Sequence, residues 1–193
     1  MLTIFDIRID SESYRASFEQ NNFGGLDLFY SQNIIANPEL TLNYNRDDWG
    51  DWIDENNDCQ NTRNEVLATF NEITPNNCTV LTGQWFGPYT QKVFFNASDI
   101  DIDHIVPVSY AHNHGGAYWS KELKQQFYND QENLLAVSKL ANTSKGNKPP
   151  TEWMPANGNY ACQYVDTFLY IVDKYHLNLL NEERNTITSQ CTN

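Results

Sequence analysis

Three residue types that together could activate water beside a metal ion occur between positions 103 and 142. Asp103 and His104 lie in an apolar run, Asn133 stands just ahead of a second apolar run, and Asn142 follows it. An imidazole titrates near neutral pH and can take a proton from water, so His104 is the candidate general base. A carboxylate and an amide carbonyl are hard oxygen ligands of the kind that suit Mg²⁺ or Mn²⁺, so Asp103 and Asn142 are the candidate metal ligands.

The elements that must position these side chains are predicted from the surrounding pattern. A strand is predicted where apolar residues alternate with acids, and its apolar members are Ile100, Ile102, Ile105, Val106 and Val108. Pro107 would shorten this strand or place it at an edge. Residues 134–137 predict a second short strand, and Ser138 is a suitable N-cap for a helix that reaches about Thr143 and ends at Gly146. Neighbours on a strand point to opposite faces, so Asp103 and His104 should diverge unless the chain kinks.

This ordered set resembles the ββα-metal finger of HNH endonucleases and is most similar to the GmrSD-type HNH family, many of whose members are secreted. The matching pieces are Asp103-His104-Ile105-Val106-Pro107, Asn133-Leu134, Asn142, Lys145-Gly146-Asn147-Lys148 and Glu152-Trp153. A weaker likeness reaches back to Tyr44 through the stretch from Asp58 to Arg63. The resemblance implies an α+β fold, in which the finger is embedded in one mixed domain with a C-terminal helical hairpin.

The resemblance also implies roles for individual residues. Asn133 would hold the ring of His104 by a hydrogen bond, and Glu152 would support the site from behind the ligands. Three cations, Lys145, Lys148 and Arg63, would contact substrate, although the two lysines could equally be solvated side chains. Asn142 stands where the family name implies a final histidine, which makes a structural zinc site less suitable. Asp101 shares a strand face with Asp103, and we expect it to face solvent.

The expected activity is therefore that of a metal-dependent endonuclease. It would hydrolyse phosphodiester bonds of DNA, with RNA as a second candidate substrate, at low sequence specificity, using one Mg²⁺ or Mn²⁺ ion. We expect a monomer that binds nucleic acid and no membrane. Two alternatives stay open: a toxin or defence effector with the same chemistry and an immunity protein as partner, and a non-catalytic extracellular binding module on the same finger.

Charge is distributed unevenly along the 193 residues. The net charge is −13, which is unusual for a protein that binds phosphates. From His104 to Pro150, however, five lysines oppose three acids, which gives +2 and leaves −15 for the rest of the chain. A mildly basic site on an acidic body fits a nuclease that binds its substrate locally.

Four cysteines occur without any Cys-x-x-Cys pair, which gives no support to a zinc or redox motif. Their order along the chain favours the disulfides Cys59–Cys78 and Cys162–Cys191, the second of which would close a helical hairpin, although three pairings are possible. Disulfides indicate an oxidising compartment. Because of these disulfides we expect a secreted or periplasmic protein. The first residues lack a signal-peptide pattern, so its signal peptide would be absent from this sequence. Four buried thiols in a cytosolic protein are the alternative.

The domain plan is one nuclease domain over 1–193. It consists of an N-terminal arm (1–45), a helix and a hairpin (46–98), the ββα-metal core (99–155) and the helical hairpin (156–193). Within these, strands are predicted at 80–85 and 91–95, and helices at 119–128, 159–175 and 179–190. His112 and His114, on a Gly-rich loop, could be surface histidines or a second metal pair.

Overall fold

The computed structural model describes residues 43–69 and 78–191. All of them belong to one unit, Thr41–Asn193. The predicted N-terminal arm lies outside the described residues up to position 42. The described residues combine helices with two small antiparallel sheets, which confirms the predicted α+β class.

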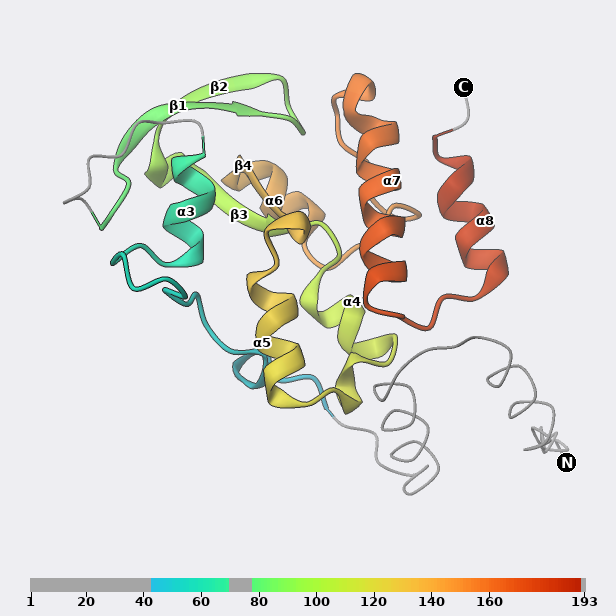
Figure 1. Cartoon of the computed structure of the whole chain (residues 1–193). Helices are drawn as coiled ribbons and strands as arrows, with labels where there is room; N and C mark the ends of the chain where they lie inside the picture. Colours follow the sequence, from blue (N-terminus) through green and yellow to red (C-terminus); the bar gives the residue numbers. More distant parts are fainter. Residues whose placement is uncertain (1–42, 70–77, 192–193) are drawn as a thin grey trace, which may run out of the picture. The chain divides into compact units, whose positions relative to one another are not determined.

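A strand pair and the helix that follows it form the part of the fold that carries the predicted site (Figure 1). Strand β3 (Ile100–His104) pairs antiparallel with β4 (Leu134–Ser138), with Ile102 opposite Ala136. Helix α6 (Lys139–Lys145) follows β4 at once, because the Ser138 side chain caps its first turn by accepting a hydrogen bond from the Ala141 amide. The predicted order of strand, insertion, strand and helix is therefore confirmed.

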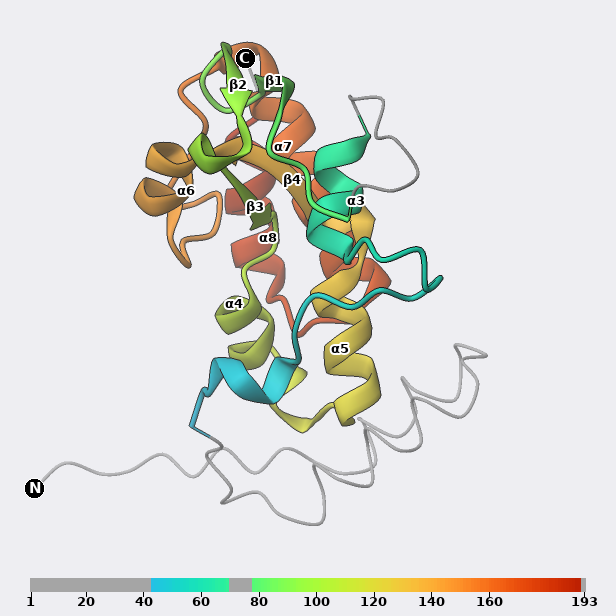
Figure 2. The same ribbon diagram turned by 90° about the vertical axis from the view of Figure 1, so that its left-hand side faces the viewer.

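The two faces of this strand pair meet different surroundings. In Figure 2, α3 (Thr62–Ala68) and α6 lie on opposite sides of the pair. On the α3 side, Ile100 and Ile102 pack with Val66 and Leu67 in the hydrophobic core. On the α6 side, the same strand presents Asp101 and Asp103, as the alternation of a strand requires.

A second antiparallel hairpin precedes β3. Strand β1 (Thr82–Gly87) pairs with β2 (Lys92–Asn96), close to the predicted ranges. Its Trp85 is fully buried and donates a hydrogen bond to the Leu67 carbonyl, which fastens the hairpin to α3. The turn between the strands brings Tyr89 to the α6 side of β3, where its hydroxyl reaches Asp103.

The insertion between β3 and β4 differs from the prediction at its start. The sequence predicted a strand that continues to Val108, but β3 ends at His104. Residues Val108–Asn113 instead form helix α4, with Pro107 at its N-cap. Proline lacks an N–H and is therefore suited to the beginning of a helix as well as to a strand edge. Helix α5 (Lys121–Asn129) confirms the helix predicted at 119–128, with Ser120 as its N-cap. Within 43–69 and 78–191, 3₁₀ turns occur at Arg46–Trp49, Ala97–Asp99, Gly116–Tyr118 and Gln131–Asn133.

Helices α7 (Gly158–Lys174) and α8 (Asn181–Ser189) form the predicted C-terminal hairpin. The disulfide Cys162–Cys191 joins them, and Cys59–Cys78 is the second bridge, so the predicted pairing is confirmed. The buried face of α7 includes Val165 and Phe168. No helix among the described residues has the length and apolar character needed to cross a bilayer.

Candidate active site

Asp103 is the centre of a buried network on the α6 side of β3. Its Oδ1 lies 2.9 Å from Lys145 Nζ, and its Oδ2 accepts a hydrogen bond of 2.7 Å from the Tyr89 hydroxyl. Lys145 Nζ also donates to the His104 carbonyl oxygen over 2.9 Å. Burial raises the pKa of Asp103, and the Lys145 charge and the Tyr89 donor oppose that shift. Each carboxylate oxygen thus already accepts one hydrogen bond from within the protein.

Lys145 was predicted to contact substrate, but the structure places it in the interior. Its side chain is 0% exposed, so its ammonium cannot meet a phosphate that approaches from solvent. The physical reason is Asp103: a buried carboxylate needs a compensating charge, and α6 places Lys145 directly against it.

His104 lies on the opposite face of the strand, among aromatic side chains. Its ring runs parallel to Trp52 at 5.5 Å, with an interplanar angle of 11°, and also contacts Tyr128. Its Nε2 lies 2.8 Å from the Tyr128 carbonyl oxygen. Because a carbonyl oxygen only accepts, Nε2 carries the proton and Nδ1 keeps the lone pair. Burial lowers the pKa of His104 to about 3, so the ring is neutral at neutral pH.

The hydrogen bonds of Asn133 differ from the prediction that it holds the His104 ring. Its side chain accepts from the Val106 amide (2.8 Å) and donates to the Val106 carbonyl (3.2 Å). Its own carbonyl accepts from the Ile105 amide. Asn133 therefore fastens the loop after His104 to the start of β4, and the ring is held by the backbone of Tyr128, which residue patterns do not reveal.

Asn142 is brought to the same side of β3 as Asp103, but its direct partner is Asp101. Its amide nitrogen donates to Asp101 Oδ2 over 3.1 Å. We predicted that Asp101 faces solvent, but it is only partly exposed and belongs to this polar cluster. Asp101, Asp103 and Asn142 thus offer oxygen atoms on one face of the strand.

The donor set is of the type that Mg²⁺ or Mn²⁺ accepts. It contains carboxylate and amide oxygens and no thiolate or free imidazole, which does not suit zinc. Across residues 43–69 and 78–191, no three His, Cys, Asp or Glu side chains gather in an arrangement that could hold a metal. A cation here would therefore have few protein ligands and would take water or phosphate oxygens as the others.

The remaining predicted residues lie outside this network. Arg63 donates to the Ile100 carbonyl on the core side of β3, at 3.4 Å. Lys148 is exposed, and its Nζ donates to the Ser144 carbonyl. Glu152 lines a separate pocket.

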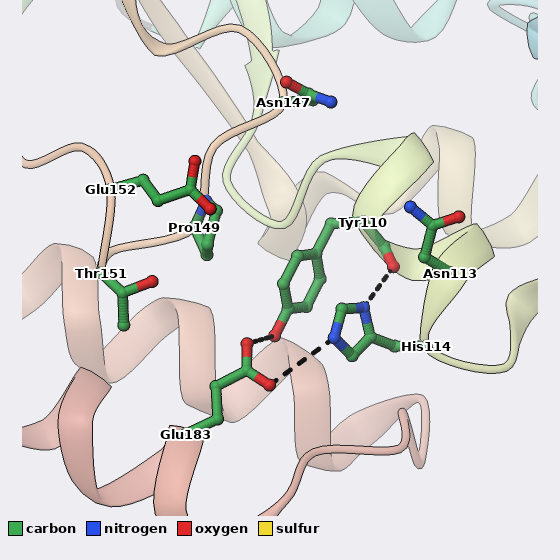
Figure 3. Close-up of a pocket in the computed structure, with 8 residues that line it drawn as sticks. All are labelled: Tyr110, Asn113, His114, Asn147, Pro149, Thr151, Glu152 and Glu183. Atoms are coloured by element: carbon green, nitrogen blue, oxygen red, sulfur yellow. Dashed lines mark hydrogen bonds and ion pairs between the residues drawn. The ribbon is translucent and has the colours of Figure 1, made fainter. Parts of the chain in front are cut away.

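That separate pocket has a volume of about 270 Å³ and lies between α4, α8 and the segment after α6 (Figure 3). Tyr110 donates to Glu183 over 2.8 Å, and His114 stacks on the Tyr110 ring with its Nε2 at 3.7 Å from Glu183. His112 instead is buried and packs against Trp49. The two histidines therefore have different surroundings and do not form the metal pair that was considered.

Comparison with known proteins gives a matching family and a similar fungal protein. The family described as "GmrSD restriction endonucleases, C-terminal domain" matches residues 55–190. An "Uncharacterized secreted protein" of Arthroderma benhamiae is 36% identical over 150 residues, which cover 76% of this chain and 73% of that protein. No solved structure matches the chain significantly.

Proposed function

The chain belongs to the family of GmrSD restriction endonuclease C-terminal domains, and we propose that it is a metal-dependent endonuclease. Its substrate would be the phosphodiester bond of DNA or RNA, cut with little sequence preference. The observation that carries this proposal is the state of His104. Its proton is fixed on Nε2 by the Tyr128 carbonyl, so Nδ1 is an unprotonated base at the end of the strand that also carries Asp101 and Asp103.

His104 Nδ1 would take the proton of the attacking water. The ring and the oxygen donors lie on opposite faces of β3, so the water and the cation would have to meet the phosphate where the strand ends. The Tyr128 carbonyl supports this step in two ways, because it fixes the tautomer and favours the charged ring once the proton arrives. Asp103 and Asn142, with Asp101, would hold Mg²⁺ or Mn²⁺, which when bound stabilises negative charge on the phosphate oxygens.

Disulfides and relatives support an extracellular site of action. The described part of the chain contains two disulfide bridges, and the fungal relative has "secreted" in its name. We infer that this protein is also secreted and that it meets nucleic acid outside the cell, where disulfides persist.

Two observations favour a second candidate, a non-catalytic extracellular binding module on the same fold. His104 is only 6% exposed, and Asp103 is neutralised by Lys145. Under this candidate the buried polar residues stabilise the fold, and no reaction takes place at the strand end.

Cleavage of supercoiled plasmid separates the two candidates. We expect nicking and linearisation with Mg²⁺ or Mn²⁺, and none with EDTA. His104→Ala should lower the rate by at least about 100-fold, the usual contribution of a general base. His176→Ala is the matched control, since it removes an exposed histidine beyond the end of α7.

Two results would count against the proposal. No cleavage with either metal by the disulfide-intact protein would favour the binding module. Full activity of a correctly folded His104→Ala variant would mean that the protein is a nuclease but that His104 is not its general base. Thermal unfolding of each variant shows whether it is folded.

A further inference from the structure

A pocket of about 440 Å³ lies beside the proposed active site, between β2, α6 and the segment around Trp153. Its volume is within the range of sites that take small organic groups. Tyr89 forms part of its wall, and the hydroxyl of the same Tyr89 donates to Asp103. Ser144, another wall residue, precedes Lys145 on α6. A group bound in this pocket would therefore lie next to the residues proposed to act on phosphate.

The charge of this pocket differs from that of the whole protein. The chain has 25 acidic and 12 basic residues, but of the described residues that line the pocket none is acidic, and Lys92 is the charged one. Lys148 adds a cation near the rim, since its Nζ donates to the carbonyl of the wall residue Ser144. On an acidic protein this is a local site for an anionic ligand.

The walls are also aromatic and apolar. Phe94 and Trp153 line the pocket, and both residues are only partly buried. Leu140 is 85% exposed at the same pocket, so its side chain is available to a ligand. A ligand with a flat apolar part and a negative charge would cover Leu140 and meet Lys92 together.

We propose that this pocket binds an unpaired nucleobase of a single-stranded nucleic acid, with the adjoining phosphate at Lys92. The inference rests on the proposed function, because it names where an unpaired base of the nuclease's substrate would be held. A base that stacks on an aromatic wall while its backbone meets lysines is the general way in which single strands are bound. A base inside a duplex is already stacked and would have to leave the helix to enter the pocket.

Binding of a fluorescent single-stranded oligonucleotide in EDTA, measured by anisotropy, tests this inference without cleavage. Leu140→Glu and Lys92→Glu change exposed side chains of the pocket, so both variants should fold. We expect each to weaken binding by about tenfold, the order that the loss of one stacked base gives. A duplex of the same sequence should bind more weakly to the wild type and should respond less to either change.

Matched controls separate the pocket from overall charge. Leu180 is 75% exposed and lies outside the pocket, so Leu180→Glu adds the same charge elsewhere. Lys121→Glu does the same for an exposed lysine of α5. Losses confined to the two pocket variants support the inference, and equal losses in the controls, or none in any variant, overturn it.

The same experiments distinguish this inference from the function on which it rests. If the wild type cuts plasmid and binds single strands, but the pocket variants bind as the wild type does, only the nucleobase site is wrong. If the wild type neither cuts nor binds any nucleic acid, the nuclease proposal fails and the pocket inference fails with it.

Discussion

Replacing Lys145 with methionine should show what the buried ion pair contributes to stability. Methionine fills a similar space without charge, and Asp103 would keep only its hydrogen bond from Tyr89. Removing one partner of a buried pair costs about 3–5 kcal/mol, because the other charge stays desolvated. In a folded unit of this size each kcal/mol lowers the melting temperature by about 2–4 °C, so we expect a loss of about 6–20 °C at pH 7.

The pH dependence of this loss has a definite sign. Burial already raises the pKa of Asp103, and Lys145 opposes that shift, so Lys145→Met should raise this pKa further. A carboxyl whose pKa is higher in the folded than in the unfolded state has no effect on stability below its unfolded pKa. Above that value it destabilises the fold, and this effect is complete once the pH has risen through the folded pKa. The deficit of Lys145→Met should therefore be larger at pH 7 than at low pH, and shrink as pH falls toward about 4, near the usual pKa of aspartate.

Thermal unfolding followed by far-ultraviolet circular dichroism measures both effects with the disulfides intact. The matched control is the double variant Asp103→Asn, Lys145→Met, in which an amide oxygen still accepts from Tyr89 and no charge is buried. We expect the control to recover most of the loss. A drop of less than about 3 °C at pH 7, or an equal drop in the double variant, would refute this reasoning.

Three other substitutions have outcomes that follow from contacts in the structure. Asn133→Ala leaves two buried backbone groups without partners and should lower the free energy of unfolding by about 2–4 kcal/mol in urea; a loss within error would show that water replaces the amide. Replacing both Cys162 and Cys191 with serine should cost about 3–4 kcal/mol, because the bridge closes a separation of 29 residues, and an unchanged melting temperature would contradict this. Trp52→Ala uncovers one face of the His104 ring and should move its pKa upward from about 3, as a proton NMR titration would show; an unmoved pKa would mean that Trp52 does not shield the ring.

The elements that sequence could predict are those set by local patterns. Alternating isoleucines and acids predict β3, the Ser138 cap and Gly146 bound α6, and the order of the cysteines favours the two bridges. The strand and the helix depend on residues close together in the chain, and the bridges on the order of the cysteines. Helix α4 was missed because Val106 and Val108 continue the alternation of β3, and Pro107 is compatible with either a strand edge or a helix start.

The partners in the site could not be predicted in the same way. His104 is held by the Tyr128 carbonyl and covered by Trp52, and Asp103 is bound by Tyr89. These contacts come from three separate segments, and a backbone carbonyl has no residue type to recognise.

Lys145 is different, because a signal for its position was available. It follows Asn142 by three residues on the same helix, and residues at that spacing share a helix face. If Asn142 faces the strand that carries Asp101 and Asp103, Lys145 must face it as well. The prediction instead followed the general rule that lysines lie in solvent or contact substrate. That rule does not hold beside a buried carboxylate, which needs a compensating charge.

The Lys145–Asp103 pair also affects what the removal of metal would mean. In proteins whose fold depends on a bound metal, the ligands are left uncompensated without it, and chelation unfolds the chain. Here the charge of Asp103 is compensated by Lys145, and Asn142 is satisfied in part by Asp101. EDTA should therefore abolish cleavage without lowering the melting temperature measured in metal-free buffer. If chelation instead unfolded the protein, the metal would have a structural role that these oxygen donors do not explain, and the loss of cleavage could not be assigned to catalysis.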